Sequence, residues 1–296
     1  MRRVLLFVGT NLAVVFLLGI IVHFLGLDRL AAVQGAGGLW PLLGYAAVFG
    51  FGGAFISLAM SKSIAKWTTG AHVIAQPRDA DERWLFDTVR HHAEKAGIGM
   101  LEIAIYDGPE MNAFATGASR NHALVAVSSG LLHGMNRDEV EAVLGHEITH
   151  VANGDMVTMT LLQGVLNTFV IFLARVVGRI VDGAIAGNNE RSGGGIGYFA
   201  VVMILQLVFG LIASLIVMAF SRRREFRADA GGARLAGRGR MIAALQRLQA
   251  QHGASTLPRA MAAFGISDRA AQGLGRLWMS HPPLEERIAA LRNAPG

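Results

Sequence analysis

Five consecutive residues of the chain have the types and spacing of a metal-dependent hydrolytic site. His146 and His150 are four positions apart, and Glu147 directly follows the first histidine. On an α-helix of about 3.6 residues per turn, positions 146 and 150 project from the same face. Two imidazole nitrogens in this arrangement suit a tetrahedral Zn²⁺. Glu147 is then placed to take a proton from a water held by the ion and to pass it to a leaving amine.

A catalytic zinc needs a third protein ligand and an open fourth position. The chain has no cysteine, and its other histidines are scattered, so we favour Glu225 as the third ligand. Asp229 follows it by four residues on the same helical face, where it can accept the second N–H of a zinc-bound imidazole. The alternative is that Glu225 only neutralises the arginines around it. Asp155, Glu94 and His281 are weaker ligand candidates.

The composition indicates a membrane protein. The chain has 296 residues, of which 52% are hydrophobic and only 16% are charged, whereas soluble domains have about 25% charged residues. The apolar residues fall in blocks, and the mean hydropathy is +0.42. This composition excludes a disordered or collagen-like chain. The absence of cysteine excludes disulfides, a thiolate nucleophile and a Cys-based zinc finger.

Four apolar segments are long enough to cross a bilayer as helices, since about 20 apolar residues suffice. We interpret the first segment as an uncleaved anchor, because its apolar stretch is longer than that of a signal peptide. Small residues recur at four-residue steps in the second, which lets another helix approach closely. The predicted spans are Val4–Leu27, Leu39–Met60, Met156–Ala174 and Tyr198–Phe220.

The basic residues predict the orientation of these spans. The net charge is +6, and most of the basic clusters flank apolar segments, which suits the cytoplasmic side of short loops. Surface aromatic residues are not interleaved with them, so we exclude nucleic acid as a partner. Both termini are then cytoplasmic. Arg175 and Arg179 do not fit, because they lie toward the outer end of the third span. The flanking clusters are Arg2–Arg3, Lys62–Lys66 and Arg222–Arg227.

The topology leaves two polar regions on one side of the membrane, which we expect to build one catalytic domain of α+β type. The whole chain is then mainly α-helical with a small β-sheet. The predicted pieces are an N-terminal transmembrane hairpin over 1–61, a first catalytic segment over 62–155, a second hairpin over 156–220 and a second catalytic segment over 221–296.

Local patterns place the candidate residues on elements. Asp79 with Glu82, and Asn136 with Glu139, have the spacing of helix N-caps and their reciprocal partners. The second pair opens the helix that carries the two histidines. Alternating apolar residues predict two strands, which we expect in a small antiparallel sheet whose edge can accept an extended peptide. These strands are predicted over 101–106 and 123–128.

Four motifs in chain order resemble those of the HtpX-type integral-membrane zinc metalloproteases, which are related to the CAAX prenyl proteases. The resemblance covers nearly the whole chain, and no catalytic position departs from the pattern. It implies four transmembrane helices and a cytoplasmic zincin-like metalloprotease domain. The matching segments are Asn112–Gly117, Gly145–Asp155, Ser221–Asp229 and Ser280–Ile288.

The resemblance also implies a site and a role. It implies one Zn²⁺ per chain, bound by His146, His150 and Glu225, with Glu147 as the catalytic acid and base. The implied activity is that of an endopeptidase that degrades misfolded or damaged membrane proteins or unfolded polypeptides at the cytoplasmic face of a bacterial inner membrane. The lipid bilayer is then a partner, and the oligomeric state stays open.

Two further residues are candidates for contacting substrate. Pro282 and Pro283 hold His281 in a stiff, extended segment before a predicted helix over 284–292. An imidazole held in this way can donate to the developing oxyanion, whereas the alternative is a surface histidine. Asn112 lies beside the predicted substrate strand, where it can hold the substrate backbone or assist the oxyanion.

Two other functions compete with this interpretation. The first is a non-catalytic scaffold or transporter with four spans and a structural or vestigial metal site, which would use polar residues within the spans such as Arg175. No acidic residue lies deep in a span, which disfavours it. The second is a protease specific for prenylated peptides, and four spans without a large many-span chamber make it the weaker choice.

Overall fold

The chain divides into two units. One comprises the described residues of 1–57 with Thr158–Val217, and the other comprises Leu58–Val157 with the described residues of 218–296. The computed structural model describes Ile20, His23–Phe24 and the ranges 38–186, 196–253 and 281–294.

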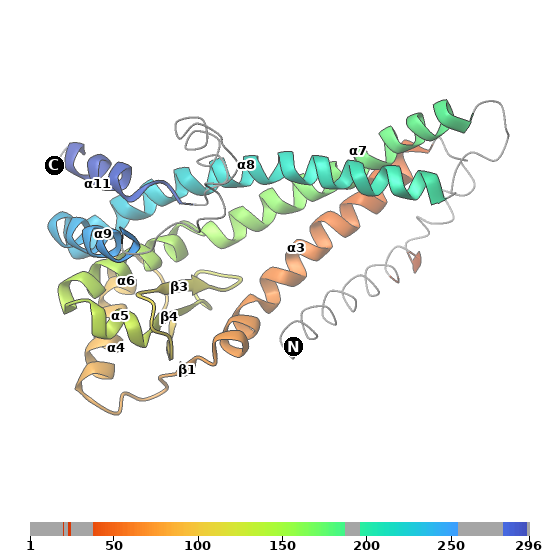
Figure 1. Cartoon of the computed structure of the whole chain (residues 1–296). Coiled ribbons are helices and arrows are strands. Elements are labelled where there is room, and N and C mark those ends of the chain that lie inside the picture. Colours follow the sequence, from red (N-terminus) through yellow and green to blue (C-terminus); the bar gives the residue numbers. More distant parts are fainter. Residues whose placement is uncertain (1–19, 21–22, 25–37, 187–195, 254–280, 295–296) are drawn as a thin grey trace. The chain divides into compact units, whose positions relative to one another are not determined.

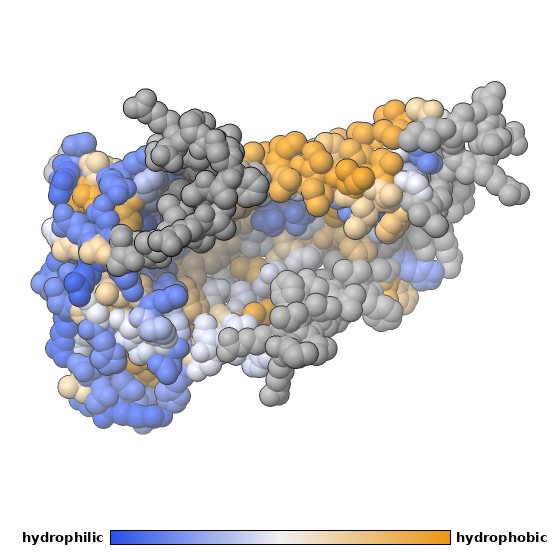
Figure 2. All heavy atoms as spheres, in the orientation of Figure 1, coloured by the Kyte–Doolittle hydropathy of each residue, from blue (hydrophilic) through white to orange (hydrophobic). Residues whose placement is uncertain are grey.

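Within the described residues, three helices are long and apolar enough to cross a membrane: α3 (Leu39–Thr69), α7 (Asp155–Ala186) and α8 (Ile196–Ala236) (Figure 1). They contain three of the four predicted spans, while Val4–Leu27 lies almost entirely outside the described residues. Figure 2 shows hydrophobic side chains gathered over α8. A continuous apolar surface of this kind is stable against lipid rather than against water.

Helix α3 packs against α7 through its small residues, as the four-residue spacing predicts. Ala46, Gly50 and Ala54 are buried. A Cβ atom added to Gly50 would lie 2.9 Å from the carbonyl oxygen of Gly164 in α7. The missing side chain therefore permits close contact between the two helices within this unit.

Arg175, one of the two arginines that do not fit the predicted spans, contacts an aromatic side chain. Its guanidinium carbon lies 4.7 Å from the centroid of the Tyr45 ring, and its Nη2 donates to the Tyr45 hydroxyl at 3.4 Å. Its Nη1 lies 3.5 Å from the carbonyl oxygen of Ile171. These contacts partly replace the hydration that the charge loses in an apolar helix.

The second unit contains a mixed four-stranded sheet in the order β1-β2-β4-β3. Strand β2 pairs parallel with β4, and β1 and β3 pair antiparallel with β2 and β4. The predicted antiparallel pairing of the segments 101–106 and 123–128 is therefore wrong. The chain between them first forms β3, which joins β4 on its far side, so that β4 enters the sheet in the same direction as β2. The strands are β1 (His72–Val73), β2 (Glu102–Tyr106), β3 (Ala113–Thr116) and β4 (Leu124–Ser128).

Helices cover this sheet and close a core between them. The capping box at the start of α6 is formed as predicted: the side chain of Asn136 accepts from the backbone N–H of Glu139, and the Glu139 carboxylate accepts from that of Asn136. Leu144 and Ile148 of α6 are completely buried in the core with Val125 of β4. The helices of this unit are α4 (Ala80–Lys95), α5 (Ser129–Gly134), α6 (Arg137–Asn153), α9 (Arg238–Gly253) and α11 (Leu284–Asn293).

The cap of α4 differs slightly from its prediction. The Asp79 side chain accepts from the backbone N–H groups of Asp81 and Glu82, as an N-cap should. The Glu82 carboxylate, however, accepts from the backbone N–H of Arg78 rather than from that of Asp79. The helix still begins where the sequence predicts.

One hydroxyl group at the end of β4 organises the segment that leads into β3. Ser128 accepts from the backbone N–H groups of Leu131 and Asn112, and it donates to the carbonyl oxygen of Glu110. A serine hydroxyl has one donor and two acceptor sites, so its bonding capacity is filled. It thereby caps α5 and fixes the backbone on either side of Met111.

Candidate metal centre

Helices α6 and α8 bring together three side chains that could hold a metal ion. One ligand atom each from His146, His150 and Glu225 lies within 4.8 Å of the other two, and all three side chains are buried. The two imidazole Nε2 atoms are 3.1 Å apart. They lie 3.6 Å (His146) and 3.4 Å (His150) from the carboxylate oxygens of Glu225. Residues from distant parts of the chain therefore converge on one point.

Glycines allow the two helices to approach closely at this point. A Cβ atom on Gly232 of α8 would lie 3.0 Å from the backbone nitrogen of His146, and one on Gly145 of α6 would lie 3.4 Å from the Cα of Gly232. A Cβ atom on Gly231 would collide with the side chain of Thr149. Because these positions lack side chains, the backbone of α8 lies against the histidine-bearing turn of α6.

The far side of the His146 ring faces a buried ion pair. Its Nδ1 lies 2.9 Å from Oδ1 of Asp229, as the spacing of Asp229 predicts. Arg287 of α11 donates to both carboxylate oxygens of Asp229, at 2.7 and 2.6 Å. Nη1 of Arg287 also lies 3.4 Å from Oε2 of Glu225. Arg287 thus compensates two buried carboxylates and holds one of them in a bidentate geometry.

The far side of the His150 ring faces a different carboxylate. Its Nδ1 lies 2.6 Å from Oδ2 of Asp155, the first residue of α7. Gly154 contributes to this contact, because its left-handed conformation (φ +67°) ends α6 and Asp155 begins α7 at the next residue. Two arginines lie at the longer distance of 3.8 Å from Asp155, namely Arg224 and Arg227.

These carboxylates control the charge of the two rings. Burial alone would lower the pKa of His146, but the nearby carboxylates of Asp229 and Glu225 outweigh it and raise the pKa to about 9. The same opposition, with Asp155 and Glu225 as partners, raises the pKa of His150. Burial works against the ionised form of Glu225, but the surrounding imidazoles hold its pKa far below its usual range.

The geometry fits a divalent cation. Because each Nδ1 faces a carboxylate, the neutral imidazole carries its proton on Nδ1. The lone pair of Nε2 then points toward the other imidazole and Glu225. Two lone pairs 3.1 Å apart repel each other unless a proton or a cation lies between them. Neither buried oxygen of Glu225 has a well-formed hydrogen bond to the described residues. Two imidazoles and one carboxylate, with space for a fourth ligand, form a donor set that suits Zn²⁺.

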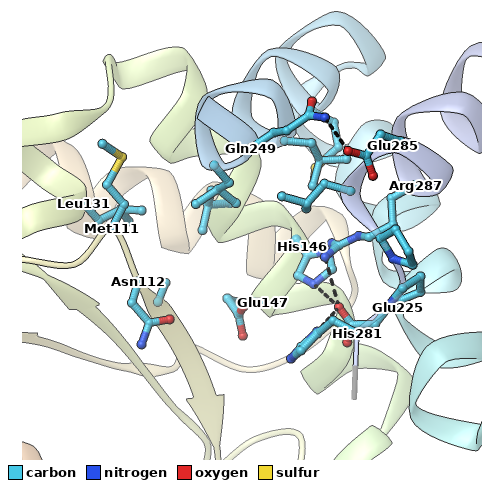
Figure 3. Close-up of a pocket in the computed structure, with 18 residues that line it drawn as sticks. Met111, Asn112, Leu131, His146, Glu147, Glu225, Gln249, His281, Glu285 and Arg287 are labelled. Atoms are coloured by element: carbon cyan, nitrogen blue, oxygen red, sulfur yellow. Dashed lines mark hydrogen bonds and ion pairs between the residues drawn. The ribbon is translucent and has the colours of Figure 1, made fainter. Parts of the chain in front are cut away.

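The remaining predicted site residues line a cavity beside this centre (Figure 3). The Glu147 carboxylate lies between Asn112, directly before β3, and His281 in the close-up view. Nδ1 of His281 lies 2.8 Å from Oε2 of Glu225, and its side chain is 62% exposed. The described structure therefore pairs His281 with the candidate ligand, and its imidazole borders the same cavity as Glu147.

Among the weaker ligand candidates, the structure separates Asp155 from Glu94. Asp155 approaches the Nδ1 atom of His150 and is not part of the cluster of potential ligands, so its position suits orienting that imidazole. Glu94 is exposed on α4 and does not belong to the cluster of potential ligands.

Arg287 was not predicted as a residue of the site. A signal was present, because Leu284, Ile288 and Leu291 form the apolar stripe of the last helix and Arg287 lies on the same face. A charged side chain on a buried face needs an ionic partner. That reasoning would have led from Arg287 to an acidic residue in the core.

The H-E-x-x-H helix, the glutamate from a second helix and the sheet beside them define a metallopeptidase that is integral to a membrane. Residues 79–294 match the model of peptidase family M48, and the chain belongs to that family. It is a metalloendopeptidase.

Relatives agree with this assignment, and one solved structure is similar in fold. The chain is 64% identical over 295 residues to "Protease HtpX" of Xanthomonas euvesicatoria, covering 100% of this chain and 98% of the relative. It is 63% identical to "Protease HtpX" of Xanthomonas campestris, with the same coverage. In fold it is similar to Saccharomyces mikatae Ste24p, with a TM-score of 0.67 and 20% identity. That comparison covers 98% of this chain and 66% of the Ste24p chain.

Proposed function

We propose that the protein is a zinc-dependent endopeptidase that cleaves misfolded or damaged membrane proteins at the cytoplasmic face of a bacterial inner membrane. The observation that carries this proposal is the convergence of His146, His150 and Glu225 beside the carboxylate of Glu147. We assign the first three as ligands of one Zn²⁺ per chain. When bound, the ion supplies Lewis acidity toward the scissile carbonyl and the attacking water.

We assign a separate role to each of the residues around the ion. Glu147 takes a proton from the attacking water and delivers it to the leaving amine, since its carboxylate borders the cavity without being a candidate ligand. Asp229 and Asp155 keep the two imidazoles in the tautomer that presents Nε2 to the metal. We assign His281 to the oxyanion, because its largely exposed imidazole borders the cavity that Glu147 also lines.

We propose that the substrate binds as an extended strand along β3. This strand is one of the two edge strands of the described sheet. Asn112, directly before it, and Ala113, its first residue, border the cavity with Glu147. Strand addition recognises the peptide backbone, which every sequence offers. Asn112 then holds the substrate backbone near the scissile bond. Such a site requires an unfolded segment, which supports damaged or misfolded proteins as substrates.

The course of the chain supports the proposed membrane location. The helix α7 begins at Asp155, directly after the turn that follows the His150 helix, and Glu225 lies on the same helix as the apolar residues of α8. The basic residues next to these apolar stretches, which include Lys62, Lys66 and Arg224, support a cytoplasmic position for the catalytic unit.

The test uses the full chain in detergent, loaded with Zn²⁺ after purification. We expect the wild-type protein to cleave casein and a denatured membrane protein, a chelator to stop it, and Zn²⁺ to restore it. Glu147→Gln should keep one zinc per chain and lose at least about a thousandfold in cleavage, because it removes the general base. Glu94→Gln is the matched control and should behave like wild type. Cleavage retained by Glu147→Gln would refute the mechanism.

A further arm separates the proposal from a protease specific for prenylated peptides. The same preparation is offered a peptide with and without a C-terminal prenyl group. We expect comparable cleavage of the two peptides. Cleavage of the prenylated peptide alone would replace general quality control by prenyl-peptide processing.

A further inference from the structure

The last turns of α3 have an exposed apolar face, although they belong to the unit that carries the metal centre. This catalytic unit begins at Leu58, and α3 continues to Thr69. Met60, Ile64 and Trp67 are exposed on this segment, and Trp67 exposes 51% of its surface. Their spacing of four and three positions places them on one face of the helix. An exposed apolar face beside polar residues is typical of an interaction site.

A different face of the same turns is fastened to the sheet. Nζ of Lys62 lies 2.6 Å from the carboxylate of Glu102, the first residue of β2, and Nζ of Lys66 lies 3.3 Å from it. Both lysines belong to a basic cluster that flanks a predicted span. Since a carboxylate of the protein itself partly neutralises their charge, the apolar face is the part of this segment that is left for a partner.

The hydroxyl groups at the end of α3 are satisfied within the helix. Oγ1 of Thr68 donates to the carbonyl oxygen of Ile64 at 2.8 Å, and Oγ1 of Thr69 donates to that of Ala65 at 2.7 Å. A polar group without a hydrogen bond is costly to remove from water. Because these two groups already have partners in the helix, the segment suits a layer in which water is scarce.

The length of α3 matches the thickness of a bilayer with its headgroup layers. Trp40, near the start of the helix, is also exposed, and it lies 27 residues before Trp67. At about 1.5 Å per residue this separation is about 40 Å along the helix, while a bilayer with its headgroups is about 40–45 Å thick. Tryptophans are enriched at both interfaces of spanning helices. The spacing therefore favours Trp67 at one interface with Trp40 at the other.

We propose that Met60, Ile64 and Trp67 are seated in the phospholipid surface of the leaflet next to the catalytic unit, and that the adjacent ion pairs with Glu102 hold the sheet at that surface. The contact with lipid thus continues past Met60, where the predicted span ends. An ion pair exposed to water contributes little to stability. At the edge of the bilayer the same pair is stronger, because less water screens it.

This anchor deepens the proposed function, on which the present step rests, because it brings β3 close to the membrane. Glu102 of β2 pairs with Leu124 of β4, which pairs with Thr116 of β3. Neighbouring strands are about 4.8 Å apart, so the backbone of Thr116 lies about 10 Å from that of Glu102. About three extended residues cover this distance. A polypeptide segment that leaves the bilayer therefore reaches the proposed substrate strand sooner than a soluble chain does.

The experiment uses the absence of cysteine from the chain, since a single introduced cysteine then carries a spin label at one chosen position. Ile64→Cys and Trp67→Cys are labelled in the full chain and reconstituted in phosphatidylcholine vesicles. We expect both labels to collide with oxygen, which partitions into lipid, more often than with a water-soluble nickel complex. The Ile64 label should lie about 4 Å deeper than the Trp67 label, because three residues of helix separate them.

Asp138→Cys, exposed on α6, is the matched control and should show the reverse preference for the two reagents. An unchanged circular-dichroism spectrum shows that each labelled chain is folded, and Ile64→Cys keeps Trp67 in place if the other variant fails to fold. Labels at 64 and 67 that prefer the nickel complex overturn the anchor. Labels that are shielded from both reagents reveal a protein surface over this face, such as a second copy of the chain, and overturn it as well.

Lipid composition separates an apolar anchor from an electrostatic one. The label depths should be the same in phosphatidylcholine vesicles and in vesicles that also contain phosphatidylglycerol, because Lys62 and Lys66 are already paired with Glu102. A depth that requires the anionic lipid would overturn the apolar anchor.

Cleavage assays test the connection between the anchor and substrates. Trp67→Ser should lower cleavage of a denatured membrane protein in vesicles more than cleavage of casein, whereas Trp67→Phe should keep the wild-type ratio of the two. The same ratio in both variants would overturn this connection. A wild-type protein that cleaves neither substrate refutes the proposed function itself and leaves the label depths unaffected.

Discussion

Three histidines of the second unit are almost fully buried, and their surroundings push their pKa values in opposite directions. His92, His146 and His150 expose 0%, 7% and 6% of their surface. Burial lowers the pKa of His92 to about 4, and a bond from its Nε2 to the carbonyl oxygen of Glu141 only partly opposes this. The pKa of His146, by contrast, is raised to about 9.

The difference comes from the partner of Nδ1. In His146 and His150 this nitrogen lies 2.9 and 2.6 Å from a carboxylate oxygen. In His92 the ion-pair contact with a carboxylate among the described residues is made by the other nitrogen, Nε2, at 3.9 Å. This carboxylate belongs to Glu141, and the charges of His91, Lys95 and Arg240 oppose protonation. A buried histidine is thus prepared for a cation by what stands behind its ring, and burial alone yields a neutral core residue.

The largest effect is expected from a substitution that removes the positive charge next to Asp229 and Glu225. Arg287→Ala leaves Asp229 and Glu225 buried without their guanidinium, and breaking a buried ion pair in this way costs about 3–5 kcal/mol. We expect that loss in the free energy of unfolding, measured in detergent with denaturant. Arg292→Ala, exposed on the same helix, should change it by less than about 0.5 kcal/mol. Equal stability of the two variants would contradict the pairing.

The next effect is the pH dependence that His92 confers. Its pKa is about 4 in the folded protein against a reference value of 6.5, so the unfolded state binds the proton more tightly. The contribution of His92 to the free energy of unfolding is therefore complete above pH 6.5 and is lost as the pH falls toward 4. The loss is about 3 kcal/mol at about 1.4 kcal/mol per unit.

The readout is unfolding by denaturant at pH 7 and at pH 4. Other groups also titrate in this range, so the comparison is between the wild-type protein and His92→Gln, which cannot take up the proton. The variant should lose less stability than wild type over this interval. The same loss in both proteins would show that His92 is not the titrating group.

A smaller effect is expected from each of the two carboxylates that face the candidate ligand rings, Asp229 at His146 and Asp155 at His150. Asp229→Asn and Asp155→Asn should each weaken zinc binding about 10- to 100-fold. Asp229→Asn should have the larger effect, because Arg287 holds that carboxylate in place. Competition with a chromophoric chelator measures the affinity, and Asp138→Asn, exposed on α6, is the control. A larger effect at Asp155 would reverse the ranking.

The smallest effect concerns the arginine next to Asp155. Arg227 is 59% exposed and lies 3.8 Å from that carboxylate, so solvent screens the pair. Arg227→Gln should change the free energy of unfolding by less than about 1 kcal/mol. The same denaturant titration measures it. A loss as large as that of Arg287→Ala would show that the two arginines are equivalent after all.

Much of the site could be predicted because its information is local or follows from topology. The spacing of His146 and His150 determines a shared helical face, and the capping box of Asn136 marks the start of that helix. The return of the chain through the last apolar segment pointed to Glu225. These features need only the geometry of one helix and a count of spans.

Other features depend on tertiary packing and could not be predicted in this way. The parallel pairing of β2 with β4 depends on where the chain inserts β3. The pairing of Arg287 with Asp229 joins two helices that are far apart in the sequence. Whether Asp155 serves as a ligand or as an acceptor depends on the turn at Gly154, and the spacing alone allowed both.

The hydroxyl of Ser128 has a consequence for how a substrate would be aligned. It binds backbone groups on either side of Met111 and so determines the residue at which β3 begins. A slip of one residue along a strand exchanges its two faces. Such a slip would turn Phe114 and Ala115 over and would offset any peptide added to that edge by about 3.3 Å. The register of cutting would therefore depend on one small side chain that never meets the substrate.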